Sequence, residues 1–183
     1  MQRFALLDEA TMTDAQRKAR DAIASGPRGA VRGPFNALLR SPELADRAQK
    51  LGEYVRYNTS LPARLSELAI LVVARYWTAQ YEWYAHSRLA LAAGLAPQVV
   101  DDMANGRRPA SMQADESAVY DFCRELHEKK SVGDAAYKKV YDLFGERGAV
   151  DLLGISGYYT LVSMVLNVDR APLPADATPL PQL

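Results

Sequence analysis

The segment from Leu61 to Tyr76 places its apolar side chains at the three-and-four spacing of an α-helix. Leu61-Pro62 opens the segment, and a proline is tolerated in the first turn of a helix. The apolar side chains at this spacing are Leu65, Leu68, Ala69, Val72, Val73 and Tyr76. This pattern predicts a buried central helix.

Capping and turn residues divide the rest of the chain into further helices. Thr13, with Gln16 three positions later, has the spacing of a capping box and predicts a helix to Ser25. Ser41-Pro42-Glu43 supplies an N-cap, a first-turn proline and a first-turn acid, and predicts a helix to about Tyr57. Further helices are expected over residues 81–93 (ending at Gly94), 97–104, 115–130, 134–144 and 146–168.

The fold class follows from these helices and from what the sequence lacks. It has no alternating run of β-branched residues and no Asn-Gly turn between such runs. We therefore expect an all-α protein of about seven or eight helices. Prolines and glycines suggest three parts: an N-terminal helix and connector (1–32), a helical domain (33–170) and an extended proline-rich tail (171–183).

Composition narrows the class of protein. Of the 183 residues, 49% are hydrophobic, which is enough for the core of one globular domain. Lys plus Arg and Asp plus Glu each number 22, and without a long basic run the chain is not expected to bind nucleic acid. The longest apolar stretch, Leu68 to Ala74, is much shorter than the ~20 residues that cross a bilayer, and the first residues lack a signal-peptide core. We expect a cytoplasmic protein without membrane contact.

Cys123 is the only cysteine, which excludes an internal disulfide, a CxxC redox pair and a cysteine-rich zinc site. Its apolar surroundings indicate a small core residue. His127, in a charged ELHEKK stretch, is interpreted as a solvated helix residue without a role. With two histidines and no phosphate-binding motif, neither a metal nor a nucleotide cofactor is expected.

Candidate chemistry is concentrated in the helical segment that follows the central helix. Glu82 and His86 are four residues apart, so their side chains share one helix face. If this helix packs antiparallel to the central one, Glu67 reaches the same point. Two carboxylates around an imidazole can handle protons near neutral pH. The same spacing also suits a Glu–His pair on an exposed helix.

Aromatic side chains are frequent in the same segment. They could line a ligand pocket, or they could be core or interface residues, which is the commoner role of aromatic residues at helical spacing. The set comprises Tyr76, Trp77, Tyr81, Trp83 and Tyr84.

The run RLSELAILVVARYWTAQYEWYAH resembles the carboxymuconolactone decarboxylase and alkylhydroperoxidase D-like superfamily. The peroxidase branch has a Glu, a CxxC pair starting twelve positions later, and a His four after the second Cys. Here the Glu is Glu67 and the His is His86, but Ala79 and Glu82 replace the cysteines. The resulting ExxxH resembles the decarboxylase branch. The resemblance extends over about Gly33 to Met103 and includes GPFNALLRSPELA.

The resemblance implies a helical enzyme that needs no cofactor and works by proton chemistry, because the peroxidase reaction requires both thiols. The implied reaction is decarboxylation or isomerisation of a small unsaturated lactone or acid in aromatic-compound catabolism. His86 would donate the proton, Glu82 would orient the His86 ring, and Glu67 would tune the local charge or relay protons. Arg64 or Arg75 could bind an anionic substrate, and Tyr81 is a further candidate for contact with the substrate. Superfamily members typically form trimers or hexamers, so a homo-oligomer is expected.

Two other functions fit the same sequence. One is a peroxidase-type antioxidant protein that has lost the CxxC pair and relies on Cys123 with an external thiol. The other is a noncatalytic oligomer that binds a small molecule, because a superfamily can keep its fold while its site changes.

Overall fold

The computed structural model describes residues 1–175 and 177–182. Within them the chain forms eight α-helices and no strand, which confirms the all-α expectation. Two short elements, η1 (Glu9–Thr11) and the π-helix η2 (Tyr54–Asn58), accompany the helices. The helices are α1 (Asp14–Ser25), α2 (Phe35–Leu38), α3 (Pro42–Glu53), α4 (Ala63–Tyr76), α5 (Gln80–Ala92), α6 (Pro97–Ala104), α7 (Ala114–Lys129) and α8 (Asp134–Asp169).

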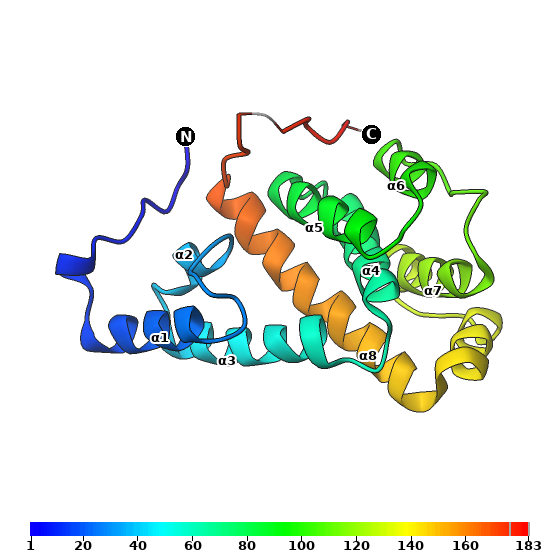
Figure 1. Ribbon diagram of the computed structural model, residues 1–183, viewed down its shortest axis with the longest axis horizontal. Helices are drawn as coiled ribbons and strands as arrows, with labels where there is room; N and C mark the ends of the chain where they lie inside the picture. Colours follow the sequence, from blue (N-terminus) through cyan, green and yellow to red (C-terminus); the bar gives the residue numbers. More distant parts are fainter. Residues whose placement is uncertain (176, 183) are drawn as a thin grey trace.

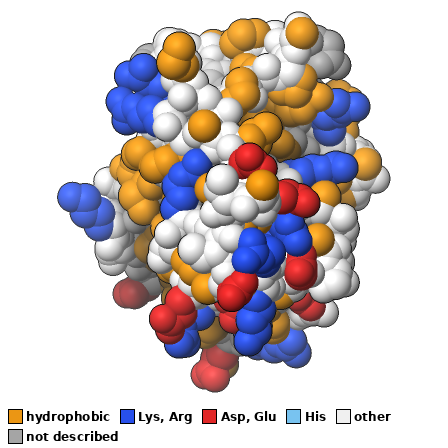
Figure 2. Space-filling view, turned by 90° about the vertical axis from the view of Figure 1, so that its left-hand side faces the viewer, with side chains coloured by type: hydrophobic (Ala, Val, Ile, Leu, Met, Phe, Trp, Pro, Cys, Tyr) orange, Lys and Arg blue, Asp and Glu red, His pale blue; other side chains and the backbone are white. Residues whose placement is uncertain are grey.

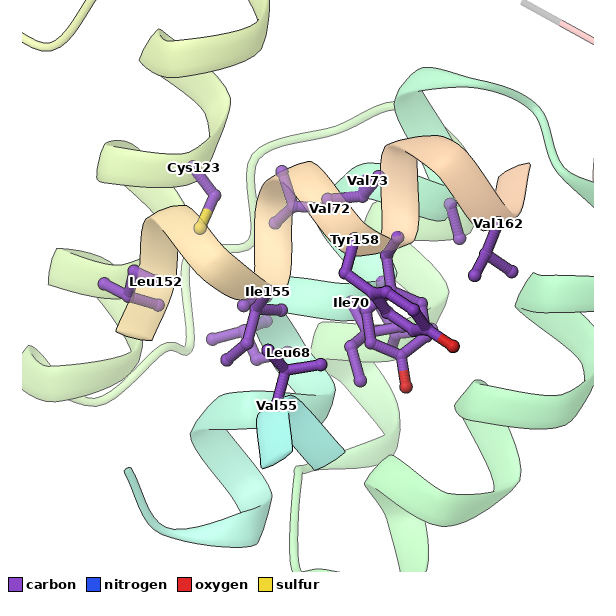
Figure 3. Close-up of a cluster of buried hydrophobic side chains, with 14 of the residues drawn as sticks. Val55, Leu68, Ile70, Val72, Val73, Cys123, Leu152, Ile155, Tyr158 and Val162 are labelled. Atoms are coloured by element: carbon purple, nitrogen blue, oxygen red, sulfur yellow. The ribbon is translucent and has the colours of Figure 1, made fainter. Parts of the chain in front are cut away.

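Helix α4 is the buried central helix that the apolar spacing predicts. Every residue from Leu65 to Ala74 is buried. The helix packs against α5, α7 and α8, and Figure 1 shows α4, α5 and α7 on the same side of α8. In Figure 3, Leu68 and Ile70 of α4 lie among Ile155 and Tyr158 of α8. An element buried on nearly all sides can hold a polar side chain in a fixed place.

Helix α8 is the longest element and runs diagonally across the molecule in Figure 1. Gly145 interrupts it with a φ of 67°, so the predicted break between the helices 134–144 and 146–168 is confirmed as a kink. By length and composition α8 could cross a membrane, which the sequence reasoning missed by considering only the longest unbroken apolar run. In this fold, 56% of its most apolar window is buried inside the protein, as in a core helix.

The N-terminal half differs from the prediction in two places. The capping box at Thr13 and Gln16 is present at the start of α1. The connector, however, contains the additional short helix α2, and the helix from Pro42 ends at Glu53 before continuing as η2. These short irregular elements lack the periodic pattern by which longer helices are recognised.

Residues near the beginning of the chain and in the described part of the tail are held against the helices. Buried Asp169, at the end of α8, accepts hydrogen bonds from the Gln2 side chain and the Phe4 backbone. Residues 171–175 and 177–182 contain no helix, and Gln80 exchanges two hydrogen bonds with the backbone of Leu180. Asp176 and Leu183 of the predicted tail lie outside the described residues.

The surface shown in Figure 2 carries basic, acidic and apolar side chains interspersed with one another. Many of the charges on the surface are paired along a helix, as for Arg47 with Glu43 and Lys50 with Asp46 on α3.

Candidate functional site

Three side chains from α4 and α5 form one buried cluster. His86 Nδ1 lies 2.6 Å from Glu67 Oε2, and His86 Nε2 lies 3.0 Å from Glu82 Oε1. His86 is 5% exposed, Glu67 8% and Glu82 3%. The imidazole therefore bridges two carboxylates, and the juxtaposition expected from the sequence is present.

The turn between the two helices brings this cluster together. Helix α4 ends at Tyr76 with Trp77 as its C-cap, Thr78 follows with a φ of 45°, and Ala79 is the N-cap of α5. This tight reversal returns α5 against α4, with which it makes its most extensive packing. Glu82 and His86 then lie one turn apart on the face of α5 toward Glu67.

The surroundings favour the protonated form of His86. Burial by itself would lower the pKa of His86, but the charge of Glu82 and the hydrogen bond to Glu67 outweigh burial and raise the pKa to about 9. At neutral pH both ring nitrogens therefore carry protons, and each proton faces one carboxylate. The arrangement is an imidazolium held between two acids.

Glu82 and His86 face a cavity of about 290 Å³, whereas Glu67 lies behind them. Helices α5 and α8 form one wall, and the connector and η2 form the other. The lining residues are Arg28, Ala30, Arg32, Gly33, Pro34, Phe35, Arg56, Tyr57, Tyr81, Glu82, Ala85, His86, Tyr158, Tyr159 and Val162.

Three of the lining residues are arginines: Arg28, Arg32 and Arg56. Within the part of the chain that the structure describes, none of the three forms an ion pair with an acid. Arg28 instead lies over the ring of Phe35, and Arg56 over the ring of Tyr57. Guanidinium groups without acidic partners give the cavity an excess of positive charge suited to carboxylates.

Two tyrosines of α8 complete the polar lining. Arg28 Nη2 donates to the Tyr158 hydroxyl at 3.3 Å, which leaves the phenolic hydrogen free to donate elsewhere. The ring of Tyr159 meets the His86 ring edge-on, with centroids 5.0 Å apart. Burial, followed by the charge of Glu82, raises the pKa of Tyr159 well above its usual value. Both phenols are therefore neutral donors at physiological pH.

Of the predicted substrate-binding residues, only Tyr81 lines this cavity. Arg64 turns toward α7, where it pairs with Asp115 at 2.7 Å and with Glu116. Arg75 donates to the backbone of Ala104 and Pro181 near the C-terminal tail. The expectation that Arg64 or Arg75 lies beside the cluster was wrong, because both side chains leave α4 on faces away from His86.

Sequence reasoning missed the cations that do line the cavity. Arg28 and Arg32 lie in the glycine- and proline-rich connector, and Arg56 lies in η2, where helical periodicity gives no guidance. One signal was available: three arginines without nearby acids, Arg28, Arg32 and Arg40, fall within thirteen residues.

The two remaining candidates have different outcomes. Cys123 is a buried core residue, as expected, and its thiol points toward α8 in Figure 3. Burial raises the pKa of Cys123 to about 12 despite the hydrogen bond from Ser156. His127 is not the solvated residue that was predicted, because it is half-buried and its ring packs 5.1 Å from that of Tyr76.

No group of three or more His, Cys, Asp or Glu residues has the arrangement of a metal site within residues 1–175 and 177–182. At the cluster itself, both nitrogens of His86 are directed at carboxylates rather than at a common point.

The fold and the site define a class: an all-α protein in which an acid–imidazole–acid cluster faces a cavity lined with arginines. The model of the carboxymuconolactone decarboxylase family matches residues 42–125. This match agrees with the resemblance found in the sequence, which is confirmed for this part of the chain. The match contains Glu67, Glu82 and His86 but ends before the tyrosines of α8. A comparison with curated proteins finds no matching relative.

Proposed function

We propose that this protein is an enzyme that transfers protons at carbon, decarboxylating or isomerising a small unsaturated lactone or carboxylic acid in aromatic-compound catabolism. The observation that carries the proposal is the position of His86, protonated between two carboxylates, with Glu82 and His86 facing the cavity and Glu67 behind them. The family match supports the reaction class.

The cavity wall suits an anionic substrate. Arg28, Arg32 and Arg56 provide more positive charge than the cluster offsets, so a substrate with two carboxylates would be held more strongly than one with a single carboxylate. The aromatic rings of Tyr81 and Tyr57 provide flat apolar surface for an unsaturated ring. The requirement for a cation, first assigned to Arg64 or Arg75, is met by these three arginines.

The geometry modifies the roles implied by the family resemblance. Because the Nε2 proton of His86 faces Glu82, the imidazolium reaches the substrate through that carboxylate. Glu82 therefore exchanges the proton with substrate carbon, and His86 resupplies it. Glu67 holds the Nδ1 proton and keeps the ring oriented, as a carboxylate does for a catalytic histidine.

In a decarboxylation, the bond between the ring carbon and its carboxylate breaks, and CO2 leaves. The electron pair passes through the conjugated double bond to the lactone carbonyl oxygen, where the neutral hydroxyls of Tyr158 and Tyr159 can donate hydrogen bonds. His86 passes its Nε2 proton to Glu82, and this proton then bonds to carbon as the electron pair returns from the carbonyl oxygen. Solvent restores the proton to His86.

The buried thiol argues against the peroxidase-type alternative. Cys123 is 0% exposed, lies outside the cavity lining and has a pKa raised to about 12. A thiolate is required for attack on peroxide, and these surroundings suppress its formation.

We further propose that the protein acts in the cytoplasm as a homo-oligomer, a trimer or hexamer. The outward face of α8 supports assembly, because apolar side chains recur there at helical spacing and are 40–64% exposed. The exposed side chains are Val150, Leu153, Met164 and Val168.

The test follows the ultraviolet absorbance of 4-carboxymuconolactone and related unsaturated lactones and acids during incubation with the purified protein. We expect turnover that falls by about 10²-fold or more in Glu82→Gln and His86→Gln and is unchanged in Cys123→Ser. No turnover of any compound, together with saturable binding, would identify the noncatalytic binder. Loss of turnover only in Cys123→Ser would identify the thiol alternative.

A further inference from the structure

A second cavity, of about 360 Å³, lies at the other end of α4. Its walls come from the last turns of α4, from α6 and from α7. Arg75 lies eight residues after Glu67 on α4, which corresponds to about 12 Å along the helix axis. The two cavities share no lining residue. Its lining includes Val72, Arg75, Tyr76, Met103, Arg124 and His127.

Arg75 supplies a positive charge that forms no ion pair with an acid within residues 1–175 and 177–182. Its Nη atoms donate to the backbone of Ala104 and Pro181 and to the Thr78 hydroxyl. Its Nε is buried and has no hydrogen-bond partner in the part of the chain that the structure describes. A buried donor without a partner costs free energy that a bound acceptor would recover.

His127 adds a second buried polar atom without a partner. Its Nε2 accepts no hydrogen bond from, and donates none to, any described residue. Burial lowers the pKa of His127, so the imidazole is neutral at physiological pH and can donate or accept one hydrogen bond. The neighbouring Arg124 is already engaged with Glu128 and with the Tyr120 hydroxyl. Arg75 is therefore the cation available to a ligand.

Besides Thr78 and Glu128, which pairs with Arg124, the cavity has apolar and aromatic walls. The Tyr76 ring packs against His127 at a tilt of 31° and is half-exposed, so a face of this pair remains accessible. Val72 and Met103 form the buried floor. Flat rings bind between such surfaces.

We propose that this second cavity binds a small planar monocarboxylate, with the carboxylate on Arg75 and His127 and the ring against Tyr76. Arg75, which has no acidic partner among the described residues, selects a single negative charge. The aromatic and apolar walls select an unsaturated ring over an inorganic anion. The proposal is independent of the reaction at His86, since it uses other residues on other faces of α4.

The chain has only two histidines, and each reports on one cavity. Benzoate is titrated into the full-length protein while the imidazole C–H signals are followed by NMR. For nine non-hydrogen atoms we expect a Kd on the order of 1 mM, seen as a saturable shift of the His127 signals. Benzamide, which has the same shape without the charge, should bind about tenfold more weakly.

Variants separate the second cavity from the first. In His86→Gln, His127 is the only histidine, and benzoate should give the same Kd. Arg75→Gln should weaken binding about tenfold or more, with an unchanged His86 signal showing that the fold is intact. Because Arg75 also holds the tail, Tyr76→Ala provides a second variant at a half-exposed position and should weaken benzoate binding through loss of the stacking surface.

Three results would overturn the proposal: a His127 signal that does not respond to benzoate, equal affinities for benzoate and benzamide, or an unchanged Kd in folded Arg75→Gln and Tyr76→Ala.

Discussion

Glu67 approaches His86 from the side away from the cavity, with Oε2 2.6 Å from Nδ1. Because Glu67 is buried behind the ring, it can influence a ligand in the cavity only through His86. The opposite nitrogen faces Glu82, which does line the cavity. The cluster thus has a direction, from a carboxylate in the core through an imidazolium to a carboxylate at the cavity.

Removing the charge of Glu67 should lower the pKa of His86. Glu67→Gln keeps the shape but replaces an anion with a neutral amide, so burial of the imidazolium is less compensated. We expect the pKa to fall from about 9 by about one unit or more, measured from the NMR titration of the His86 ring. Glu43→Gln, at an exposed position of α3, is the matched control and should leave the titration unchanged. An unaltered pKa in Glu67→Gln would contradict the role assigned to this carboxylate.

The same pKa predicts how stability depends on pH. The pKa of His86 is about 9 in the folded state and about 6.5 in the unfolded state, so its contribution is fully present below pH 6.5 and is lost as pH rises through 9. The shift corresponds to about 3 kcal/mol of unfolding free energy. The free energy of unfolding, measured by denaturant titration, should therefore decrease with pH between 6.5 and 9.5 more steeply in the wild type than in His86→Gln. Parallel curves over this range would show that His86 is not protonated in the fold.

Cys123 should be chemically inert in the folded protein. Burial raises its pKa to about 12, so almost no thiolate forms at pH 8. We expect a thiol-reactive disulfide reagent to label the native protein only as fast as it unfolds, and to label it at once in denaturant. Rapid labelling of the native state would require access to the thiol that the packing of α7 on α8 does not provide.

The cluster was predictable from sequence because its residues lie on regular helices. The four-residue spacing places Glu82 and His86 on one face, and the buried pattern of α4 brings Glu67 to the same point. The cavity was not predictable. Arg28 and Arg32 come from the connector, and their positions depend on how α1 and α3 pack rather than on any local period.

Arg64 illustrates the converse error. Its position three residues before Glu67 suggests a common site, but a three-residue step on a helix still leaves room for a side chain to turn to a neighbouring element. The acids Asp115 and Glu116 at the start of α7 determine where Arg64 goes. Such partners lie far along the chain and become evident only in the fold.

Gly52 leaves space for the hydrogen bond between Arg28 and Tyr158, two residues that line the first cavity. A Cβ at this position would collide with the Tyr158 hydroxyl and with Arg28 Nη2, which are themselves hydrogen-bonded. Gly52→Ala should therefore push both side chains out of place, destabilise the protein by about 1–3 kcal/mol and weaken the binding of carboxylate ligands at the first cavity.

Gly157 is the matched control, because it also lies in a helix and a Cβ there meets no atom within 4 Å. Gly157→Ala should be neutral or stabilise the fold by up to about 1 kcal/mol, because alanine loses less backbone entropy on folding than glycine does.

Thermal unfolding and ligand titration of the two variants give the comparison. Equal stability and equal affinity in both would mean that Arg28 and Tyr158 adjust without cost and that their contact does not shape the cavity. If stability and affinity at the first cavity fall only in Gly52→Ala, and affinity at the second cavity does not change, then a glycine on α3 determines the position of the Arg28 charge in the first cavity.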